Sequence, residues 1–272
     1  MRTAELIHEL TIPIRIEILN VLRDKTLNLS SIYGELNNRK LNAPLSTISR
    51  HVKTLHELGL IRKSEGKYAI SGTGMFLLDL IVQLNDISVW DEINISSEFV
   101  ALLPNELKLG LSTLKNAEIE RDVYSAIFKA FEAVENAKSW GKYIDRIIHY
   151  DIYKTMLLKN LEGVSEKVIS SRDTLKRRVG TFLKALIDLN LSKNELEIIK
   201  SKCEWRVMDL PVQLGVIDGE VAFFQILKKN RESPIYISRD KKCIKWVTDL
   251  FDFFWEKAEP FYLSKHVDAL KF

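Results

Sequence analysis

The chain has 272 residues, of which 46% are hydrophobic and 28% charged, and its net charge is +3. This composition is typical of a globular protein large enough for two modest domains, and it excludes a chain that is disordered throughout. No apolar run reaches the ~18 residues of a membrane-spanning helix, and Cys203 and Cys243 are too far apart for a metal knuckle. We therefore expect a cytoplasmic protein without a membrane partner.

The charge is distributed unevenly along the chain. Residues 1–72 contain eleven Lys and Arg against seven Asp and Glu, a net charge of +4, so residues 73–272 carry a net charge of −1. A small basic domain joined to a near-neutral one is typical of a DNA-binding module attached to a part with a second task.

Two short helices are predicted before residue 40. Residues 12–22 contain Pro13, which suits the first turn of a helix, and continue with apolar residues at helical spacing. Residues 30–36 place Ile32 and Leu36 four positions apart, which puts both on one face of a helix.

Residues 46–58 are predicted to form a third helix. Ser46 is a preferred N-cap residue type, and Gly59 can end the helix in a left-handed conformation. One face of this helix is apolar and the other carries small hydroxyl and basic side chains. The apolar face consists of Ile48, Val52 and Leu55.

The polar face of this third helix suits the major groove of DNA. Small side chains let the backbone approach the base edges, and cations meet phosphate or guanine. The alternative is an ordinary surface helix, because charged outer faces are common. The residues predicted to contact DNA from this helix are Ser46, Thr47, Ser49, Arg50, His51, Lys53 and Thr54.

Residues 60–70 are predicted to form a β-hairpin. Two short β-prone runs flank Glu65-Gly66, a pair that suits a tight turn. We expect the hairpin to lie on the DNA backbone as a wing. Its predicted DNA contacts are Arg62, Lys63 and Lys67.

The segment STISRHVKTLHELGLIRK, residues 46–63, resembles the arsenic-repressor-type branch of the winged helix-turn-helix superfamily. The resemblance covers about residues 10–90 and implies that the helix beginning near Ser46 enters the major groove, with the hairpin along the adjacent backbone. Members of that branch often sense metal through Cys-x-Cys in the reading helix or through His and carboxylates on the dimer helix. This chain lacks both arrangements, so we expect no metal site.

Residues 75–84 are apolar almost all round, so a helix here must be buried on every side. One side can pack on the winged domain, and a partner subunit is the expected cover for the other, because two-fold dimers are the commonest oligomers. The alternative is that the C-terminal domain folds back over this helix. The residues predicted to form a homodimer interface are Phe76, Leu77, Leu80, Ile81 and Leu84.

Residues 138–272 are predicted to form a mixed α/β domain, in which strand-like runs alternate with helical ones and end in antiparallel hairpins. The first strand is expected at residues 143–150, which are rich in β-branched and aromatic residues. Residues 1–72 are then the DNA-binding domain, and residues 73–137 the dimerisation helix and a helical linker. The expected fold class is therefore α+β or mixed.

Two further segments, DLPVQLGVIDG at 209–219 and CIKWVTDLFDFFW at 243–255, resemble the sensor domain of archaeal methanogenesis-regulator-type transcription factors. The resemblance implies a winged helix followed by an α/β module similar to phospholipase-D-like domains. Val247 stands where members of that family tend to carry Gly. The Asp-Gly pair that ends the first segment is also a strong hairpin signal.

Phospholipase-D-like catalysis needs His-x-Lys with an Asp further on. The chain's single His-x-Lys is His51-Val52-Lys53, inside the predicted reading helix, and no Asp stands five residues past Lys53. The sequence also lacks a glycine-rich phosphate loop and a Gly-x-Ser-x-Gly elbow. We therefore expect no enzyme activity, no catalytic residues and no cofactor.

Residues 172–178 form the densest basic cluster outside the winged domain. They are either a solvated helix start or a site for an anionic effector or a second DNA contact, because helix N-termini favour anions. The candidate residues are Arg172, Lys176, Arg177 and Arg178. Five large aromatic residues either line a ligand pocket or fill the core; they are Trp140, Trp205, Phe223, Tyr236 and Trp246.

These patterns together predict a sequence-specific transcriptional regulator that binds double-stranded DNA as a homodimer. A small-molecule effector of the C-terminal domain is an open part of this hypothesis. One alternative is an architectural or replication-associated winged-helix protein, whose binding would rest on salt-sensitive contacts alone. A second alternative is a phosphodiesterase-like enzyme.

Overall fold

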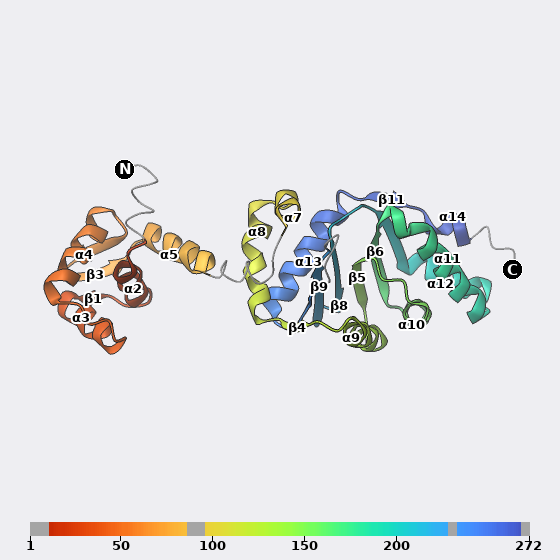
Figure 1. Cartoon of the computed structure of the whole chain (residues 1–272), viewed down its shortest axis with the longest axis horizontal. Helices are drawn as coiled ribbons and strands as arrows, with labels where there is room; N and C mark the ends of the chain where they lie inside the picture. The colour runs from red at the N-terminus through yellow and green to blue at the C-terminus, as the bar shows by residue number, and fades with distance from the viewer. Residues whose placement is uncertain (1–10, 86–95, 228–232, 268–272) are drawn as a thin grey trace. The chain divides into compact units, whose positions relative to one another are not determined.

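The computed structural model describes residues 11–85, 96–227 and 233–267. The chain divides into two compact units, Met1–Ser88 and Val89–Phe272 (Figure 1). This division differs from the three parts expected from the sequence. The apolar helix after the hairpin belongs to the first unit. Residues 96–137, which were expected to form a linker, belong to the second.

Apart from the two-residue strand β1, which was not expected, the elements of the first unit follow the order expected from the sequence. They are α2 (Pro13–Val21), β1 (Leu27–Asn28), α3 (Leu29–Asn38), α4 (Leu45–Glu57), β2 (Ile61–Ser64), β3 (Lys67–Ile70) and α5 (Gly72–Asn85). Among the described residues, the strands form an antiparallel sheet in the order β1-β3-β2. The β2–β3 hairpin is confirmed. Its turn residues Glu65 and Gly66 have φ of 49° and 75°, the left-handed values that a two-residue hairpin turn requires.

The core of the first unit is formed by the apolar faces of its helices. Ile48, Val52 and Leu55 of α4 are each at most 1% exposed, so the predicted apolar face is confirmed. Leu78 of α5 is also fully buried in this core. A Cβ at Gly74 would lie 2.1 Å from the carbonyl oxygen of Leu60, so α5 can begin this close to the chain because position 74 has no side chain.

Helix α4 begins differently from the prediction. Its N-cap is Pro44, whose side chain makes no capping bond, and Ser46 lies inside the first turn. The Pro44 carbonyl accepts hydrogen bonds from the backbone N–H groups of Thr47 (2.9 Å) and Ile48 (3.1 Å). The helix therefore begins at Leu45, one residue before the expected start at Ser46. The predicted end of the helix is confirmed, since Gly59 has φ of 71°.

The second unit is a mixed α/β fold. Its first half contains α7 (Ser97–Leu102), α8 (Asn105–Gly110), the 3₁₀ helix η2 (Leu111–Asn116), β4 (Glu118–Glu120), α9 (Val123–Glu135), β5 (Trp140–Asp145), α10 (Tyr150–Leu161), β6 (Ser165–Ser170), α11 (Arg172–Leu189) and α12 (Lys193–Lys202). Its second half contains β7 (Cys203–Val207), β8 (Val212–Ile217), β9 (Val221–Ile226), β10 (Ile235–Ser238), α13 (Lys241–Trp255), β11 (Glu259–Phe261) and α14 (Leu263–Val267).

The strands described in the second unit form one eight-stranded sheet in the order β11-β7-β6-β5-β8-β9-β10-β4. Strands β5, β6 and β7 are parallel, and the other pairs are antiparallel. Helices cover both faces of this sheet. Successive side chains of one strand point to opposite faces, so neighbouring residues pack against different helices. Phe224 of β9 packs with α13, whereas Phe223 packs with α9.

Strand β5 ends earlier than the expected strand at 143–150. Asp145, its last residue, accepts a hydrogen bond from the backbone N–H of Ile147 (2.6 Å), which turns the chain before α10 begins at Tyr150. Side-chain hydrogen bonds of this kind compete with a strand ladder, so the β-branched residues after Asp145 do not continue the strand.

The Asp-Gly pair of the 209–219 segment forms the predicted turn between β8 and β9. Asp218 and Gly219 have φ of 52° and 66°. The Asp218 carboxylate accepts from the backbone N–H groups of Ser139 (2.9 Å) and Trp140 (2.8 Å) at the start of β5. This part of the second resemblance therefore has a structural role.

Among the described residues, none of the helices combines the length and the apolar character that crossing a membrane requires.

Candidate functional site

The first candidate site is the polar face of α4 with the adjacent hairpin. Ile48, Val52 and Leu55 hold one side of α4 in the core, so the opposite side is turned to solvent. Ser46, Arg50 and Lys53 are exposed, and Thr47, Ser49 and Thr54 are partly exposed. The hairpin residues Arg62, Lys63 and Lys67 are exposed as well. We call these nine residues the basic surface.

The cations of the basic surface are weakly engaged within the unit. Lys53 Nζ lies 3.7 Å from Glu57 Oε1, an exposed pair one helical turn apart, and such pairs contribute little to stability. Lys63 Nζ lies 5.5 Å from the centre of the Tyr68 ring. Thr54 Oγ1 donates to the backbone carbonyl of Arg50, so this bond does not involve the Arg50 guanidinium. These side chains can therefore turn to an anionic partner at small cost.

His51 does not belong to this surface, so its predicted contact with DNA is wrong. It is 8% exposed, and its Nδ1 accepts a hydrogen bond from Arg15 Nε (3.1 Å), which joins α4 to α2. The spacing could have shown this, because position 51 lies three residues after Ile48 and four before Leu55 and so shares their face. His51 therefore holds α4 in place against α2.

The bond from Arg15 requires an unprotonated Nδ1, and this makes the first unit sensitive to pH. Burial, followed by the charges of Arg15 and Arg50, lowers the pKa of His51 below its ordinary 6.5. The unfolded chain takes up this proton near pH 6.5, whereas the folded unit resists it. Stability is therefore highest above about pH 6.5 and falls as the pH is lowered towards the folded-state pKa.

We expect His51→Gln to remove this part of the pH dependence. Urea unfolding of the first unit at a series of pH values between about 5 and 7.5 would measure it. His56→Gln is the matched control, because His56 is exposed on the same helix. An equal pH slope in the native protein and in His51→Gln would contradict this assignment.

Helix α5 is only partly covered within the first unit. Leu77 and Ile81 pack against the core around the buried Leu78, whereas Phe76 and Val82 are 64% and 40% exposed. Leu80 is partly exposed, and the side chain of Leu84 lies outside the described residues. The predicted dimer residues are therefore divided. Leu77 and Ile81 stabilise their own unit, whereas the side chain of Phe76 is left largely uncovered by the described residues of that unit.

The basic cluster at 172–178 does not converge on one site. Arg172 donates from Nη1 to Asp209 (3.1 Å) and from Nη2 to Glu259 (2.6 Å). Lys176 and Arg177 are exposed, whereas Arg178 is 2% exposed and points into the second unit. A shared anion site with Arg178 as a member is therefore wrong. Helical spacing explains it, since Arg178 is adjacent to the buried Val179 and four residues before Phe182.

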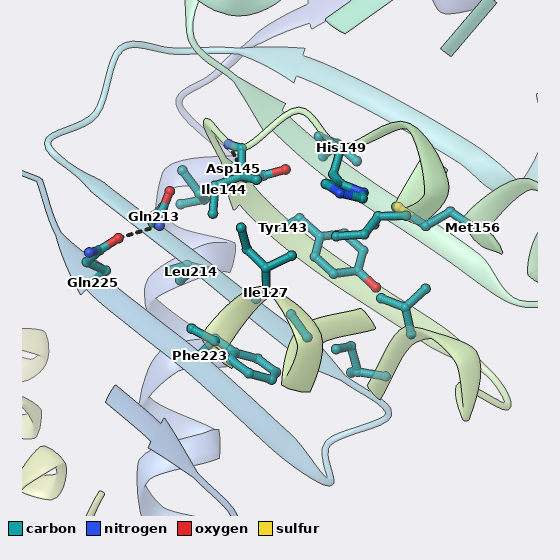
Figure 2. A pocket seen from close by; sticks show the side chains of 18 of the residues that line it. Ile127, Tyr143, Ile144, Asp145, His149, Met156, Gln213, Leu214, Phe223 and Gln225 are labelled. Atoms are coloured by element: carbon teal, nitrogen blue, oxygen red, sulfur yellow. Dashed lines mark hydrogen bonds between the residues drawn. The ribbon is translucent and has the colours of Figure 1, made fainter. Parts of the chain in front are cut away.

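The second candidate site is a cavity of about 110 Å³ in the second unit, between α9, α10 and strands β5, β8 and β9. Figure 2 shows Ile127, Tyr143 and Phe223 around it, with Asp145 and Gln213 along one side. Of the aromatic residues considered from the sequence, Trp205 and Phe223 line this cavity, whereas the others pack in the core between the sheet and α13. These others are Trp140, Tyr236 and Trp246.

The described residues contain no cluster of three or more His, Cys, Asp or Glu side chains that could hold a metal ion. Cys203 and Cys243 are both buried as free thiols. Cys203 Sγ donates to Glu166 (3.0 Å) and lies 3.1 Å from Asn160 Oδ1, within the fold.

No protein-family model and no curated protein sequence matches this chain. Among solved structures it is similar to TrmBL2, an archaeal chromatin protein with a novel mode of DNA binding, at 16% identity over 91% of this chain and 94% of that one, with a TM-score of 0.42. It is similar to Nuc of Salmonella typhimurium, a phospholipase D family member, at 13% identity over 54% and 97%, with a TM-score of 0.37. PigF with SAH gives 9% identity over 77% and 67%, with a TM-score of 0.23.

Proposed function

We propose that the first unit is a winged helix-turn-helix that binds double-stranded DNA, with α4 in the major groove and the β2–β3 hairpin as the wing. The observation that carries this proposal is the two-sided nature of α4. Its apolar face and His51 fix it to the core, while Thr47, Ser49 and Arg50 face outward. Short hydroxyl side chains allow close approach to base edges, and Arg can pair with guanine in a bidentate manner.

The hairpin supports the proposal from a second direction. The hairpin carries three exposed cations, Arg62 and Lys63 on β2 and Lys67 on β3. The tight turn at Glu65-Gly66 keeps the two strands in register. Cations on a hairpin beside a reading helix suit phosphate contacts, which position a protein on DNA without reading its sequence.

The first test separates base reading from phosphate contact. We expect Arg50→Ala to weaken binding to the preferred DNA site by about 1–3 kcal/mol and to relax the preference at one base position. Lys67→Ala should weaken binding to all duplexes alike and reduce the slope of log K against log salt by about 1. Site selection from a random duplex library, followed by anisotropy titrations at several salt concentrations, measures both.

Lys193→Ala is the matched control, because Lys193 is an exposed cation of the second unit outside the basic cluster at 172–178. It should leave DNA affinity unchanged. An Arg50→Ala variant with native affinity and native base preference would show that α4 is not the reading helix. Equal, salt-sensitive binding to all duplexes by the native protein would favour the architectural alternative over a regulator.

We also propose that the protein is a homodimer through α5. Phe76 is 64% exposed and lies one helical turn from the partly exposed Leu80, on the side of α5 opposite the buried Leu78. A two-fold partner would cover this face and would place two α4 helices on half-sites about 34–36 Å apart.

Phe76→Ser should give a folded monomer with much weaker DNA binding, because Phe76 is 64% exposed in its own unit and contributes little to that unit's core. Leu78→Ser should instead unfold the unit, since Leu78 is fully buried there. Sedimentation and circular dichroism of both variants measure assembly and folding separately. A monomeric native protein at micromolar concentration would contradict the dimer.

We propose regulation of transcription as the biological task, carried out in the cytoplasm and without catalysis. In the second unit, neither histidine stands in a His-x-Lys arrangement: His149 is followed by Tyr150-Asp151 and His266 by Val267-Asp268. A turnover assay with a chromogenic phosphodiester tests the enzyme alternative.

A ligand of the second unit can alter DNA affinity if it binds the DNA-competent and incompetent states unequally.

A further inference from the structure

We propose that the cavity of the second unit is a binding site for a small, uncharged, mainly apolar molecule that carries a hydroxyl head group. The cavity measures about 110 Å³ and is lined mostly by aliphatic and aromatic side chains. The cavity is partly open to solvent, and an enclosed apolar cavity of about 150 Å³ is sufficient for a benzene ring. The available space therefore suits one ring or a chain of five or six carbons.

The apolar wall of the cavity sets the body of the ligand. Ala130 and Ile127 of α9 line the cavity. Figure 2 shows Ile127 with Met156 of α10, Phe223 of β9 and Tyr143 of β5 around it. Apolar area removed from water is the main source of affinity for such a site. A sugar-like or highly charged body would lose its hydration here without polar partners in return.

The polar side of the cavity sets the head group, and its hydrogen bonds determine which atoms are available. Gln225 Nε2 donates to the carbonyl of Ser233, so Gln225 Oε1 faces Gln213. Gln213 must then present Nε2 to Gln225, which leaves its Oε1 without a donor among the described residues. Together with Asp145, whose side chain is 31% exposed, this makes the polar side rich in acceptors. A ligand head there must donate a hydrogen bond.

The charges lining the cavity exclude an ionic head. Asp145 is already paired with Arg178 (3.3 Å), so a bound ammonium or carboxylate would add an uncompensated charge to a largely apolar site. Two donors in the same lining, Arg178 Nε and Trp205 Nε1, are buried without a partner among the described residues. A hydroxyl is uncharged and donates one hydrogen bond, so it suits the acceptors on the polar side of the cavity.

Three matched probes of the same size test this proposal with the full chain: benzyl alcohol, benzylammonium and benzoate. We expect calorimetry and thermal melting to show saturable binding of benzyl alcohol, with either ion at least about tenfold weaker. Binding of an ion as tight as that of the alcohol would overturn the choice of head group. Absence of binding by all three probes would overturn the site.

Two variants locate the binding. Ala130→Leu should fill the cavity and abolish binding of benzyl alcohol, whereas Phe128→Leu, at a 69% exposed position of the same helix, should leave it unchanged. Gln213→Met keeps the size of the side chain and removes the acceptor, so it should weaken the alcohol severalfold. Native affinity in both Ala130→Leu and Gln213→Met would place the bound alcohol elsewhere. Binding to this cavity does not require DNA binding by the first unit, so each proposal can fail without the other.

Discussion

Replacing Arg178 by alanine should lower the free energy of unfolding of the second unit by about 3–5 kcal/mol. The side chain is 2% exposed. Its Nη1 donates to the hydroxyl of Tyr153 (2.6 Å) and to the Asp145 carboxylate (3.3 Å), and its Nη2 donates to the Asp145 carbonyl. The alanine variant would leave these acceptors unpaired and would add an empty volume beside α10, and both effects destabilise the fold.

Arg177→Ala is the matched control for this prediction. Arg177 precedes Arg178 on α11 but is exposed, so its removal should change the free energy of unfolding by less than about 0.5 kcal/mol. Urea unfolding followed by tryptophan fluorescence measures both variants. Equal, small effects at the two positions would mean that Arg178 is dispensable and that its hydrogen bonds add nothing to the fold.

Replacing Trp246 by alanine should cost the second unit about 3–5 kcal/mol as well, since it removes a large buried aromatic side chain. Trp246 lies on α13 and is 4% exposed. Its Nε1 donates to the Leu107 carbonyl (2.8 Å), and its ring packs edge-on against Phe224 at 5.2 Å between centroids. A Cβ at Gly110 would lie 2.0 Å from Trp246 Cδ1, so the end of α8 also fits closely against this ring.

Trp246→Phe separates packing from hydrogen bonding at this position. It keeps an aromatic ring and loses the bond to Leu107, so its cost should be lower, about 1–2 kcal/mol. Denaturant unfolding of both variants, with circular dichroism as the probe, gives the two values. A cost below about 1 kcal/mol for Trp246→Ala would show that the Trp246 side chain contributes little to this core.

The local elements of this protein could be predicted from its sequence because short-range patterns produce them. The apolar spacing of Ile48, Val52 and Leu55 gives α4 its buried face, and Gly59 ends that helix by adopting a left-handed conformation. The two hairpin turns follow from residue pairs that tolerate positive φ. From the same patterns, the sequence by itself indicated a reading helix, a basic hairpin and a mixed α/β second part.

Helical spacing places His51 and Arg178 on buried faces, but the partners of these buried polar residues were decided by the tertiary structure. His51 and Arg178 each occur among residues that suggest solvent contact, yet both are buried. Their partners lie far away in the chain: Arg15 is 36 residues before His51, and Asp145 is 33 residues before Arg178. A buried polar group needs a hydrogen-bond partner, and local periodicity cannot say which distant residue supplies it.

The tertiary structure also decided where the second unit begins and that it contains a cavity. Residues 97–116 have the composition of a helical linker, but Trp246, 139 residues after Leu107, binds them to the sheet and α13. The cavity is lined from α9, α10 and strands that are separated by many residues in the sequence. The sequence determined where most helices and strands lie, because these depend mainly on neighbouring residues. Their order in the sheet, and the space left between them, depend on contacts between residues far apart in the chain, which only the folded structure brings together.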